Sequence, residues 1–128
     1  MGKVRTLLVD DMVELRAMIR LALERSERFE VVGEAGDGQA AIEVATATRP
    51  DLVLLDVAMP RMDGLEALPR LRAHVPEATV IMLSGFSEQR LGARAAALGA
   101  AAYLEKGLAP AALVARLLEV LEADRPAD

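Results

Sequence analysis

The chain has 128 residues, which is the size of one domain, because single hydrophobic cores typically enclose about 100–200 residues. With 53% hydrophobic and 27% charged residues it can bury a core without a disulfide or metal staple, which excludes a disordered or fibrous chain. A net charge of -5 and only 2% aromatic residues argue against direct binding of nucleic acid. The sequence contains no cysteine, which excludes disulfides, thiolate zinc sites and thiol catalysis.

The longest runs without a charged residue, 78–87 and 95–104, span ten residues each. A bilayer crossing needs roughly 18 apolar residues, so we expect no membrane partner. The apolar stretch that begins at Thr6 is interrupted at Asp10, too early for the apolar region of a signal peptide. We therefore expect a cytoplasmic protein.

Short runs rich in leucine and β-branched residues alternate with longer segments of helical spacing. We predict strands over residues 4–9, 29–34, 52–55, 79–83 and 101–104. Several of these runs are apolar on successive residues, a pattern typical of strands covered on both faces. The sheet is therefore predicted to be parallel.

The segments between these strands carry apolar residues at helical intervals. The first predicted helix has its apolar stripe at i, i+3, i+4 and i+7, formed by Leu15, Met18, Ile19 and Ala22. Arg16 and Arg20 fall on the opposite, charged side, which we expect to face solvent. The segment 38–48 repeats the spacing, and the last helix should begin at Pro110, since proline is favoured at the first helical position.

Strict alternation of strands and helices predicts right-handed crossovers and a doubly wound α/β fold with five strand–helix pairs. We expect one domain over residues 1–123, followed by a polar tail at 124–128 that is either a frayed end or the start of a linker. Because one domain uses nearly all 128 residues, we expect no output module within this chain.

Polar residues follow four of the predicted strands: Asp10 and Asp11, Asp56, Ser84, and Lys106. In an open parallel sheet, ligands bind beyond the carboxyl ends of the strands. Three carboxylates that converge there raise one another's pKa unless a cation neutralises them. A few oxygen ligands suit Mg²⁺, which keeps several waters and often gains phosphate oxygens. For Asp11 alone, capping of the following helix is an alternative explanation.

Asp56 is the candidate nucleophile. A carboxylate that attacks a phosphoryl group forms an acyl phosphate, and the transfer mainly requires neutralisation of the phosphoryl oxygens. A divalent metal, the Lys106 ammonium and the Ser84 hydroxyl would supply it. Taken singly, a solvated lysine or a serine in a turn is commonplace, so the prediction depends on the combination.

These residues lie in motifs with a distinctive spacing. Asp11 and Asp56 are 45 residues apart, Asp56 and Ser84 are 28 apart, and Ser84 and Lys106 are 22 apart. From Val4 to about Ala123, the chain resembles the receiver domain of two-component response regulators. The motifs that carry this resemblance are Val9-Asp10-Asp11, Asp56-Val57-Ala58-Met59-Pro60-Arg61-Met62-Asp63-Gly64, Met82-Leu83-Ser84-Gly85 and Ala102-Tyr103-Leu104-Glu105-Lys106.

The resemblance implies a five-stranded sheet in the order 2-1-3-4-5. It also implies that Asp56 accepts a phosphoryl group from a histidine kinase or phosphotransfer protein, with Lys106 and Ser84 contacting that group. The implied ligands of Mg²⁺ are Asp10, Asp11, Asp56 and the backbone carbonyl of Ala58.

The resemblance further implies a switch in which Ser84 moves toward the phosphate and Tyr103 rotates. A half-buried aromatic on an edge strand is the alternative interpretation of Tyr103, but its place three residues before Lys106 favours the switch role. The switch would remodel a face formed by helix 94–98, strand 101–104 and helix 109–118. That face would control a downstream target or an output domain, or pair two copies as a homodimer.

Two positions depart from the family pattern. The family usually has a proline in a cis peptide after the lysine, whereas this chain has Gly107, and we hypothesise that the Lys106–Gly107 bond is still cis so that the lysine reaches the site. Ala58 and Phe86, two residues after Asp56 and Ser84, are apolar. Neither can position an attacking water, so we predict slow loss of phosphate.

Two other functions are alternatives to a signalling phosphoacceptor. A phosphohydrolase of the haloacid dehalogenase type also uses a strand-end aspartate, Mg²⁺ and a lysine, but its general acid is an aspartate at the position of Ala58. A constitutive docking module would usually lack some of the acidic or lysine residues, and this chain has them all. We therefore expect no turnover of a substrate.

Overall fold

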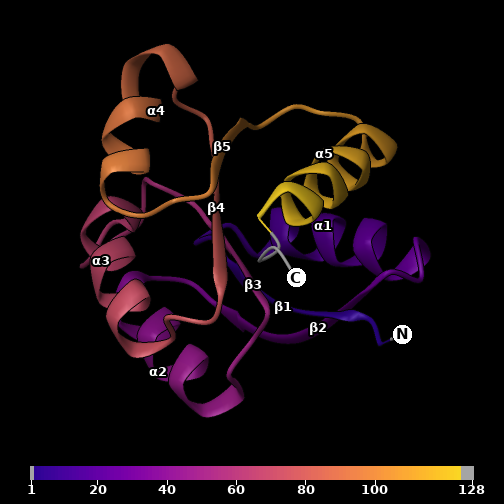
Figure 1. Ribbon diagram of the computed structural model, residues 1–128, viewed down its shortest axis with the longest axis horizontal. Helices are drawn as coiled ribbons and strands as arrows, with labels where there is room; N and C mark the ends of the chain where they lie inside the picture. Colours follow the sequence, from indigo (N-terminus) through magenta and orange to yellow (C-terminus); the bar gives the residue numbers. More distant parts are fainter. Residues whose placement is uncertain (1, 125–128) are drawn as a thin grey trace.

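The computed structural model describes residues 2–124 and shows a parallel sheet with helices on both faces (Figure 1). The strands follow the order β2-β1-β3-β4-β5, which confirms the predicted doubly wound α/β fold. In chain order the elements are β1 (Val4–Val9), α1 (Val13–Arg25), β2 (Phe29–Ala35), α2 (Gly38–Thr48), β3 (Leu52–Leu55), α3 (Gly64–His74), β4 (Thr79–Ser84), α4 (Glu88–Ala97), β5 (Ala102–Glu105) and α5 (Pro110–Ala123).

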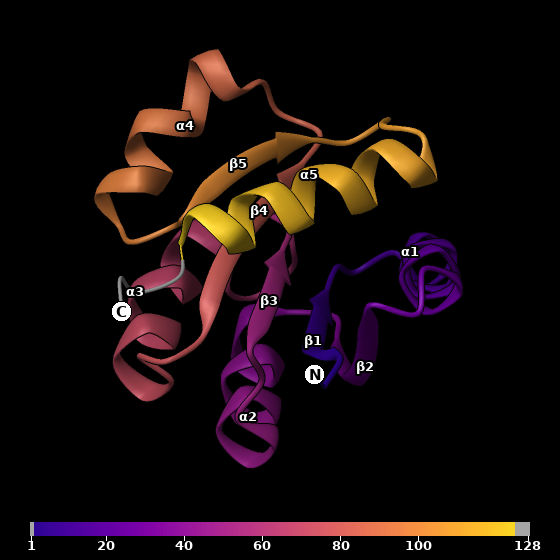
Figure 2. The ribbon, with the colours of Figure 1, turned by 45° about the vertical axis from the view of Figure 1, so that its right-hand side comes forward.

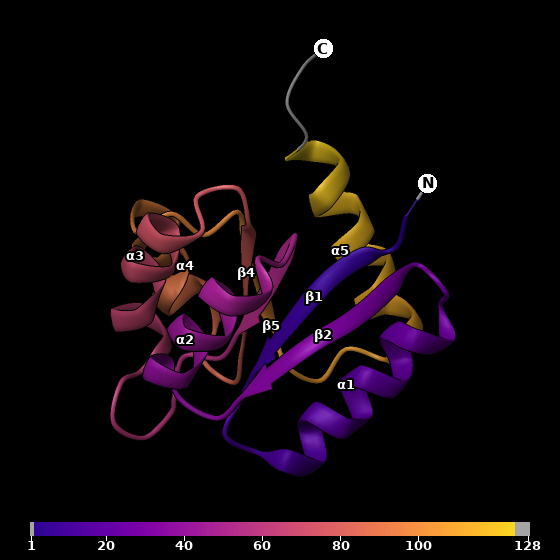
Figure 3. The same cartoon turned by 90° about the horizontal axis from the view of Figure 1, so that it is seen from below.

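Two helices cover one face of the sheet and three cover the other. Helices α1 and α5 lie together on one side, and α2, α3 and α4 lie on the opposite side (Figures 2 and 3). Each face has its own apolar cluster, with Leu23 and Leu117 in one and Leu68 in the other. All four residues of β3 are buried, as expected for a central strand of a parallel sheet.

Helix α1 differs from the predicted pattern in two residues. Ile19 and Leu23 form its buried line, whereas Met18, expected in the stripe, is 66% exposed. The helix contacts β2 and α5 at one edge of the sheet, so only a narrow strip of it is covered. Arg16, expected to face solvent, has a side chain that is only 16% exposed.

Several elements extend beyond their predicted limits, including β2, which runs on to Ala35. Strands β4 and β5 run on to Ser84 and Glu105, because these two residues continue the parallel pairing of their strands. Helix α4 begins at Glu88, since the Ser87 side chain accepts a hydrogen bond from the Arg90 N–H and caps it. Ser84 is therefore a buried strand residue instead of a loop residue.

The last described helix, α5, ends at Ala123. Of the predicted polar tail, only Asp124 is described, where its carboxylate accepts a hydrogen bond from the Thr79 hydroxyl at 2.7 Å. Residues 125–128 lie outside the described part of the chain. Among residues 2–124, none of the helices has the length and apolar character needed to span a bilayer.

Candidate functional site

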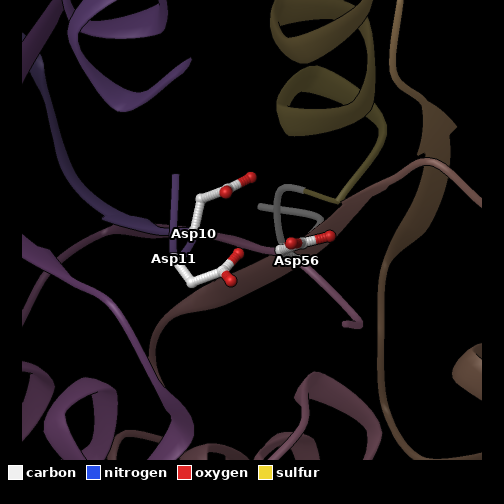
Figure 4. Close-up of side chains that lie close together, drawn as sticks. All are labelled: Asp10, Asp11 and Asp56. Carbon is white, nitrogen blue, oxygen red and sulfur yellow. The ribbon is translucent and has the colours of Figure 1, made fainter. Parts of the chain in front are cut away.

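Three carboxylates converge at the carboxyl edge of the sheet. Asp10 and Asp11 follow β1, and Asp56 follows the neighbouring strand β3. Each offers an oxygen atom that lies within 4.8 Å of the other two (Figure 4). Asp10 and Asp56 are each only 4% exposed, whereas Asp11 is exposed.

Asp10 is fixed by the backbone around it. Its N–H donates to the carbonyl of Ala35 at 3.0 Å, and its carboxylate accepts a hydrogen bond from the Met12 N–H at 2.9 Å. Met12, not Asp11, is the N-cap of α1, and no side chain caps that helix. The capping explanation of Asp11 is therefore wrong, because the Asp11 side chain does not accept a hydrogen bond from the first turn of α1.

Asp56 lies between a backbone donor and a cation. One carboxylate oxygen accepts a hydrogen bond from the Val57 N–H at 2.9 Å, and the other lies 3.2 Å from the Lys106 Nζ. Burial and the charge of Asp10 raise the pKa of Asp56 to about 6, although Lys106 acts in the opposite direction. At neutral pH the Asp56 carboxylate is thus mostly ionised, but less completely than an ordinary aspartate, and a further cation would favour the ionised form.

Lys106 bridges two of the acids. Its Nζ lies 2.8 Å from Asp10 Oδ2 as well as 3.2 Å from Asp56 Oδ2. Burial disfavours its charge, but the hydrogen bond to Asp10 and the two carboxylate charges outweigh that cost and raise the pKa of Lys106. The ammonium is therefore held charged inside the acidic cluster.

The peptide bond after Lys106 is trans, so the hypothesis of a cis bond is wrong. The Lys106 N–H donates to the Ser84 carbonyl at 2.8 Å, which fixes the residue at the end of β5. Gly107 has a φ of +108°, a conformation that L side chains rarely adopt. The turn is made by glycine at this φ value, and the lysine reaches both carboxylates without a cis bond.

Ser84 and Tyr103 both bind the loop between β4 and α4. The Ser84 hydroxyl accepts a hydrogen bond from the Phe86 N–H at 3.1 Å, and the Tyr103 hydroxyl donates to the Phe86 carbonyl at 2.9 Å. Ser84 is fully buried and Tyr103 is 6% exposed, so Tyr103 is more deeply buried than we expected. The two side chains thus bind opposite polar groups of a single residue.

The loop between β3 and α3 passes very close to Asp56. A Cβ atom on Gly64 would lie 1.9 Å from the Asp56 carbonyl oxygen, which is far too close. Only glycine, which has no Cβ, fits at this position. Asp63 caps α3 in a capping box with Glu66. Gly64 and Asp63 therefore shape the chain around the candidate nucleophile.

An open groove leads to the acidic cluster from the side of α4. Its lining includes Asp11, Ala58, Phe86, Arg90 and Leu91. Ala58, a predicted carbonyl ligand, is exposed in this groove beside Asp11. The Arg90 guanidinium lies 5.4 Å from the centroid of the Phe86 ring. We did not predict Arg90, since an arginine four residues after an aromatic residue has no specific signal in the sequence.

The donor set fits a hard divalent cation. Three carboxylates supply oxygen only, two of them are buried, and the Lys106 ammonium beside them has a flexible stem that allows it to move. Asp10 and Asp11 together with Asp56 would hold the ion, and charge neutralisation would relieve the repulsion between Asp10 and Asp56.

Residues 6–118 match the family model of the response regulator receiver domain. The chain is 45% identical over 105 residues to the transcriptional regulatory protein PdtaR of Mycobacterium tuberculosis, covering 80% of this chain and 49% of PdtaR. It is 38% identical over 122 residues to the response regulator UvrY of Escherichia coli, covering 95% of this chain and 56% of UvrY. It therefore spans about half the length of these relatives. It is also 40% identical over 118 residues to the chemotaxis protein CheY of Listeria monocytogenes, covering 92% of this chain and 95% of CheY.

Solved structures show the same relationship. The receiver domain of the response regulator NarL from M. tuberculosis has a TM-score of 0.89 and 34% identity, and the alignment covers 98% of this chain and 100% of that domain. A chain of the CheX–CheY–BeF₃–Mg²⁺ complex from Borrelia burgdorferi has a TM-score of 0.85 and 29% identity, with 91% of this chain and 88% of that chain covered.

Proposed function

The chain belongs to the response regulator receiver domain family of two-component systems, and from this premise we propose that it takes a phosphoryl group onto Asp56 in the presence of Mg²⁺. The observation that carries the proposal is the placement of the Lys106 ammonium 3.2 Å from a buried Asp56 carboxylate, beside two further aspartates. A phosphohydrolase needs a second acid beyond the nucleophile, and the side chain two residues after Asp56 is that of Ala58.

Each residue has a part in the transfer. An Asp56 oxygen attacks phosphorus as the bond from phosphorus to the histidine nitrogen of the donor breaks, and the product is an acyl phosphate. Bound Mg²⁺ supplies positive charge to the phosphoryl oxygens. Lys106 would exchange one of its carboxylate contacts for a phosphoryl oxygen, and Ser84 would donate its hydroxyl to another.

Phosphorylation would be transmitted through Phe86. Ser84 and Tyr103 both bind the backbone of that residue, so a Ser84 hydroxyl drawn to the phosphate gives up the Phe86 N–H. The loop before α4 would then shift, together with Tyr103 on β5. We infer that the face made by α4, β5 and α5 changes its partner, either a target protein, an output domain or a second copy of this chain.

The donor is a histidine kinase or a phosphotransfer protein, and helix α1 offers it a docking face. Exposed apolar side chains lie along this helix and the residue before it: Met12, Val13, Met18 and Leu21, each more than half exposed. The patch is continuous with the site, because Met12 directly follows Asp11. Exposed apolar patches of this kind typically bind proteins.

One experiment separates the three functions. The chain is incubated with acetyl phosphate and Mg²⁺, and its intact mass is measured over time. We expect a species heavier by about 80 Da, one phosphoryl group, that is absent in Asp56→Asn. Catalytic consumption of acetyl phosphate without a phosphorylated chain would support the hydrolase. An unchanged mass with no consumption would support the constitutive docking module.

A second experiment tests the docking face. Met18→Glu should slow phosphotransfer from a phosphohistidine protein at least about tenfold, since it places a charge in an apolar interface, but leave phosphorylation by acetyl phosphate unchanged. Ala47→Glu on the exposed side of α2 is the matched control and should affect neither reaction. Equal transfer to wild type and Met18→Glu would exclude α1 as the docking face.

A further inference from the structure

We propose that Arg16 is a positioning residue for the metal site, and that it acts with Glu34 to hold the backbone of Asp10 and Asp11 in the shape that binds a divalent cation. The inference rests on the proposed function, because it concerns the same site. It assigns a role to a side chain that the helical pattern placed on the solvent side of α1.

Arg16 connects three elements at once. From α1, one terminal nitrogen of its guanidinium donates to the backbone carbonyl of Asp10, and its Nε donates to Glu34 Oε1 of β2 at 3.0 Å. The Arg16 side chain is 16% exposed and that of Glu34 is 26% exposed, so both are shielded from most of the solvent. Arg20, one helical turn further on, donates to the other oxygen of Glu34.

The Asp10 carbonyl is the point where the chain leaves the sheet. The Asp10 N–H still pairs with Ala35 of β2, and the Asp10 carboxylate turns back to the Met12 N–H. Asp10 is buried, so its carbonyl needs a protein partner, and Arg16 is the partner that it has. The bond therefore fixes the peptide that joins Asp10 to Asp11.

Asp11 depends on that peptide for its direction. Within residues 2–124 its carboxylate accepts no protein hydrogen bond, yet an oxygen of this carboxylate lies within 4.8 Å of ligand atoms of Asp10 and Asp56. The backbone conformation and the side-chain rotamer of Asp11 therefore set the direction of its carboxylate toward Asp10 and Asp56. If the peptide rotates, Asp11 leaves the cluster while Asp10 and Asp56 stay bound to Lys106.

The ion pair with Glu34 explains how the Arg16 guanidinium can lie beside a site that binds a metal cation. The Glu34 carboxylate offsets the charge of the Arg16 guanidinium, so the bridge sets geometry with little repulsion toward a bound metal. Arginine suits the role because its rigid planar fork donates in two directions at once, which a lysine ammonium on a flexible stem does less well. Residues that orient metal ligands from outside typically change metal affinity about 10–100-fold when removed.

The test compares Mg²⁺ dissociation constants, measured by isothermal titration calorimetry on the full chain, for the wild type, Arg16→Ala, Arg16→Lys and Arg20→Ala. We expect Arg16→Ala to weaken binding about tenfold and Arg16→Lys to recover only part of it. Arg20→Ala removes the same charge and a bond to the same glutamate but no contact with Asp10, and should stay within about twofold of wild type.

Phosphorylation by acetyl phosphate gives an independent readout. For Arg16→Ala, the rate at saturating Mg²⁺ should approach that of the wild type, while the Mg²⁺ concentration for half-maximal rate rises about tenfold. If Arg16→Ala fails to fold in a urea titration, Glu34→Gln, which weakens the bridge without removing atoms of Arg16, should weaken Mg²⁺ binding at least about threefold.

The outcomes distinguish this inference from the proposed function. Equal Mg²⁺ affinity of Arg16→Ala and wild type, with the wild type phosphorylated on Asp56, overturns the role of Arg16 alone. Equal losses in Arg16→Ala and Arg20→Ala also overturn it, because they indicate a charge effect instead of a bond to Asp10. A wild type that neither binds Mg²⁺ nor accepts phosphate overturns the proposed function.

Discussion

The Lys106 ammonium lies 3.2 Å from the Asp56 carboxylate, yet burial and the nearby Asp10 still raise the pKa of Asp56 to about 6. One lysine therefore offsets the repulsion within the acidic cluster only in part. The acidic cluster of Asp10, Asp11 and Asp56 holds more negative charge than the Lys106 ammonium neutralises. A divalent ion would neutralise this surplus, and a phosphoryl group, which is itself negative, would depend on that ion.

The surplus charge predicts a specific pH dependence of stability for the metal-free protein. Asp56 binds its proton more tightly in the folded state, at a pKa of about 6, than in the unfolded chain, where aspartate titrates near ~3.9. Its contribution therefore stabilises the fold at low pH and is lost as the pH rises through about 6. Asp56→Asn lacks this titration, so relative to wild type it should gain on the order of 1–3 kcal/mol in unfolding free energy between pH 4 and pH 7.

Urea titrations with a chelator at several pH values between 4 and 7 measure this difference. Glu43→Gln, on the exposed side of α2, is the control and should show no such trend. A difference between Asp56→Asn and wild type that stays constant with pH would contradict the raised pKa of Asp56. Saturating Mg²⁺ should reduce the trend, because the ion binds the ionised carboxylate.

The close approach at Gly64 predicts a large loss of stability on substitution. In Gly64→Ala the new Cβ would lie 1.9 Å from the Asp56 carbonyl oxygen, so β3 and α3 must move apart. We expect a loss of about 3 kcal/mol or more in the free energy of unfolding, measured by urea titration. Gly85→Ala is a matched control, because a Cβ there meets no atom within 4 Å and its φ is not positive. Similar losses in the two variants would show that the contact is not the cause.

Much of the fold follows from local pattern. The apolar run 52–55 forms strand β3, and Pro110 begins α5, both as predicted from local composition and proline chemistry. The acidic residues were found because a parallel sheet collects the ends of its strands on one edge. The strand order, by contrast, came from resemblance to a family, because apolar runs do not specify which strands are neighbours.

The errors have a common physical origin in contacts distant in sequence. Met18 and Arg16 were assigned to the wrong sides of α1, since the helix contacts β2 and α5 along a narrow strip and Glu34 draws Arg16 inward. Asp11 resembles a helix cap, but the helix begins one residue later than such a cap requires, with Met12 as its N-cap residue. The cis peptide was inferred from family geometry, and Gly107 makes the turn through its φ value.

Arg61 carries a backbone strain that a pair of substitutions can measure. Its φ is +66°, a left-handed conformation, and its guanidinium binds Asp37, the N-cap of α2, at 2.7 Å. The Ala40 N–H and the Arg61 guanidinium lower the pKa of Asp37, so the acceptor is ionised at neutral pH. Arg61→Gly and Arg61→Ala both lose this contact, but only glycine is relaxed at positive φ.

We therefore expect Arg61→Gly to be more stable than Arg61→Ala by about 1 kcal/mol in urea titrations. At Arg70, an exposed residue inside α3, the same two substitutions should rank in the opposite order, because glycine within a helix costs about 1 kcal/mol relative to alanine. The same order at both positions would mean that the φ of Arg61 carries no strain.

The groove beside Asp56 predicts a long-lived phosphorylated state. Hydrolysis of an acyl phosphate needs a water aligned with phosphorus, and a polar side chain near the site can orient it. The side chains of Ala58 and Phe86 line the groove and cannot accept a proton from water or donate one to it. We expect the phosphate on Asp56 to be lost slowly, over minutes or longer, when acetyl phosphate is removed and intact mass is followed.

Ala58→Asn places an amide at the mouth of the site and should shorten the lifetime at least about threefold, because the amide can orient a water toward phosphorus. Ala47→Asn, on the exposed side of α2, makes the same chemical change far from the groove and should leave the lifetime unchanged. A wild-type half-life of seconds would mean that another group activates the water. Equal lifetimes for Ala58→Asn and wild type would mean that water access, and not its orientation, limits hydrolysis.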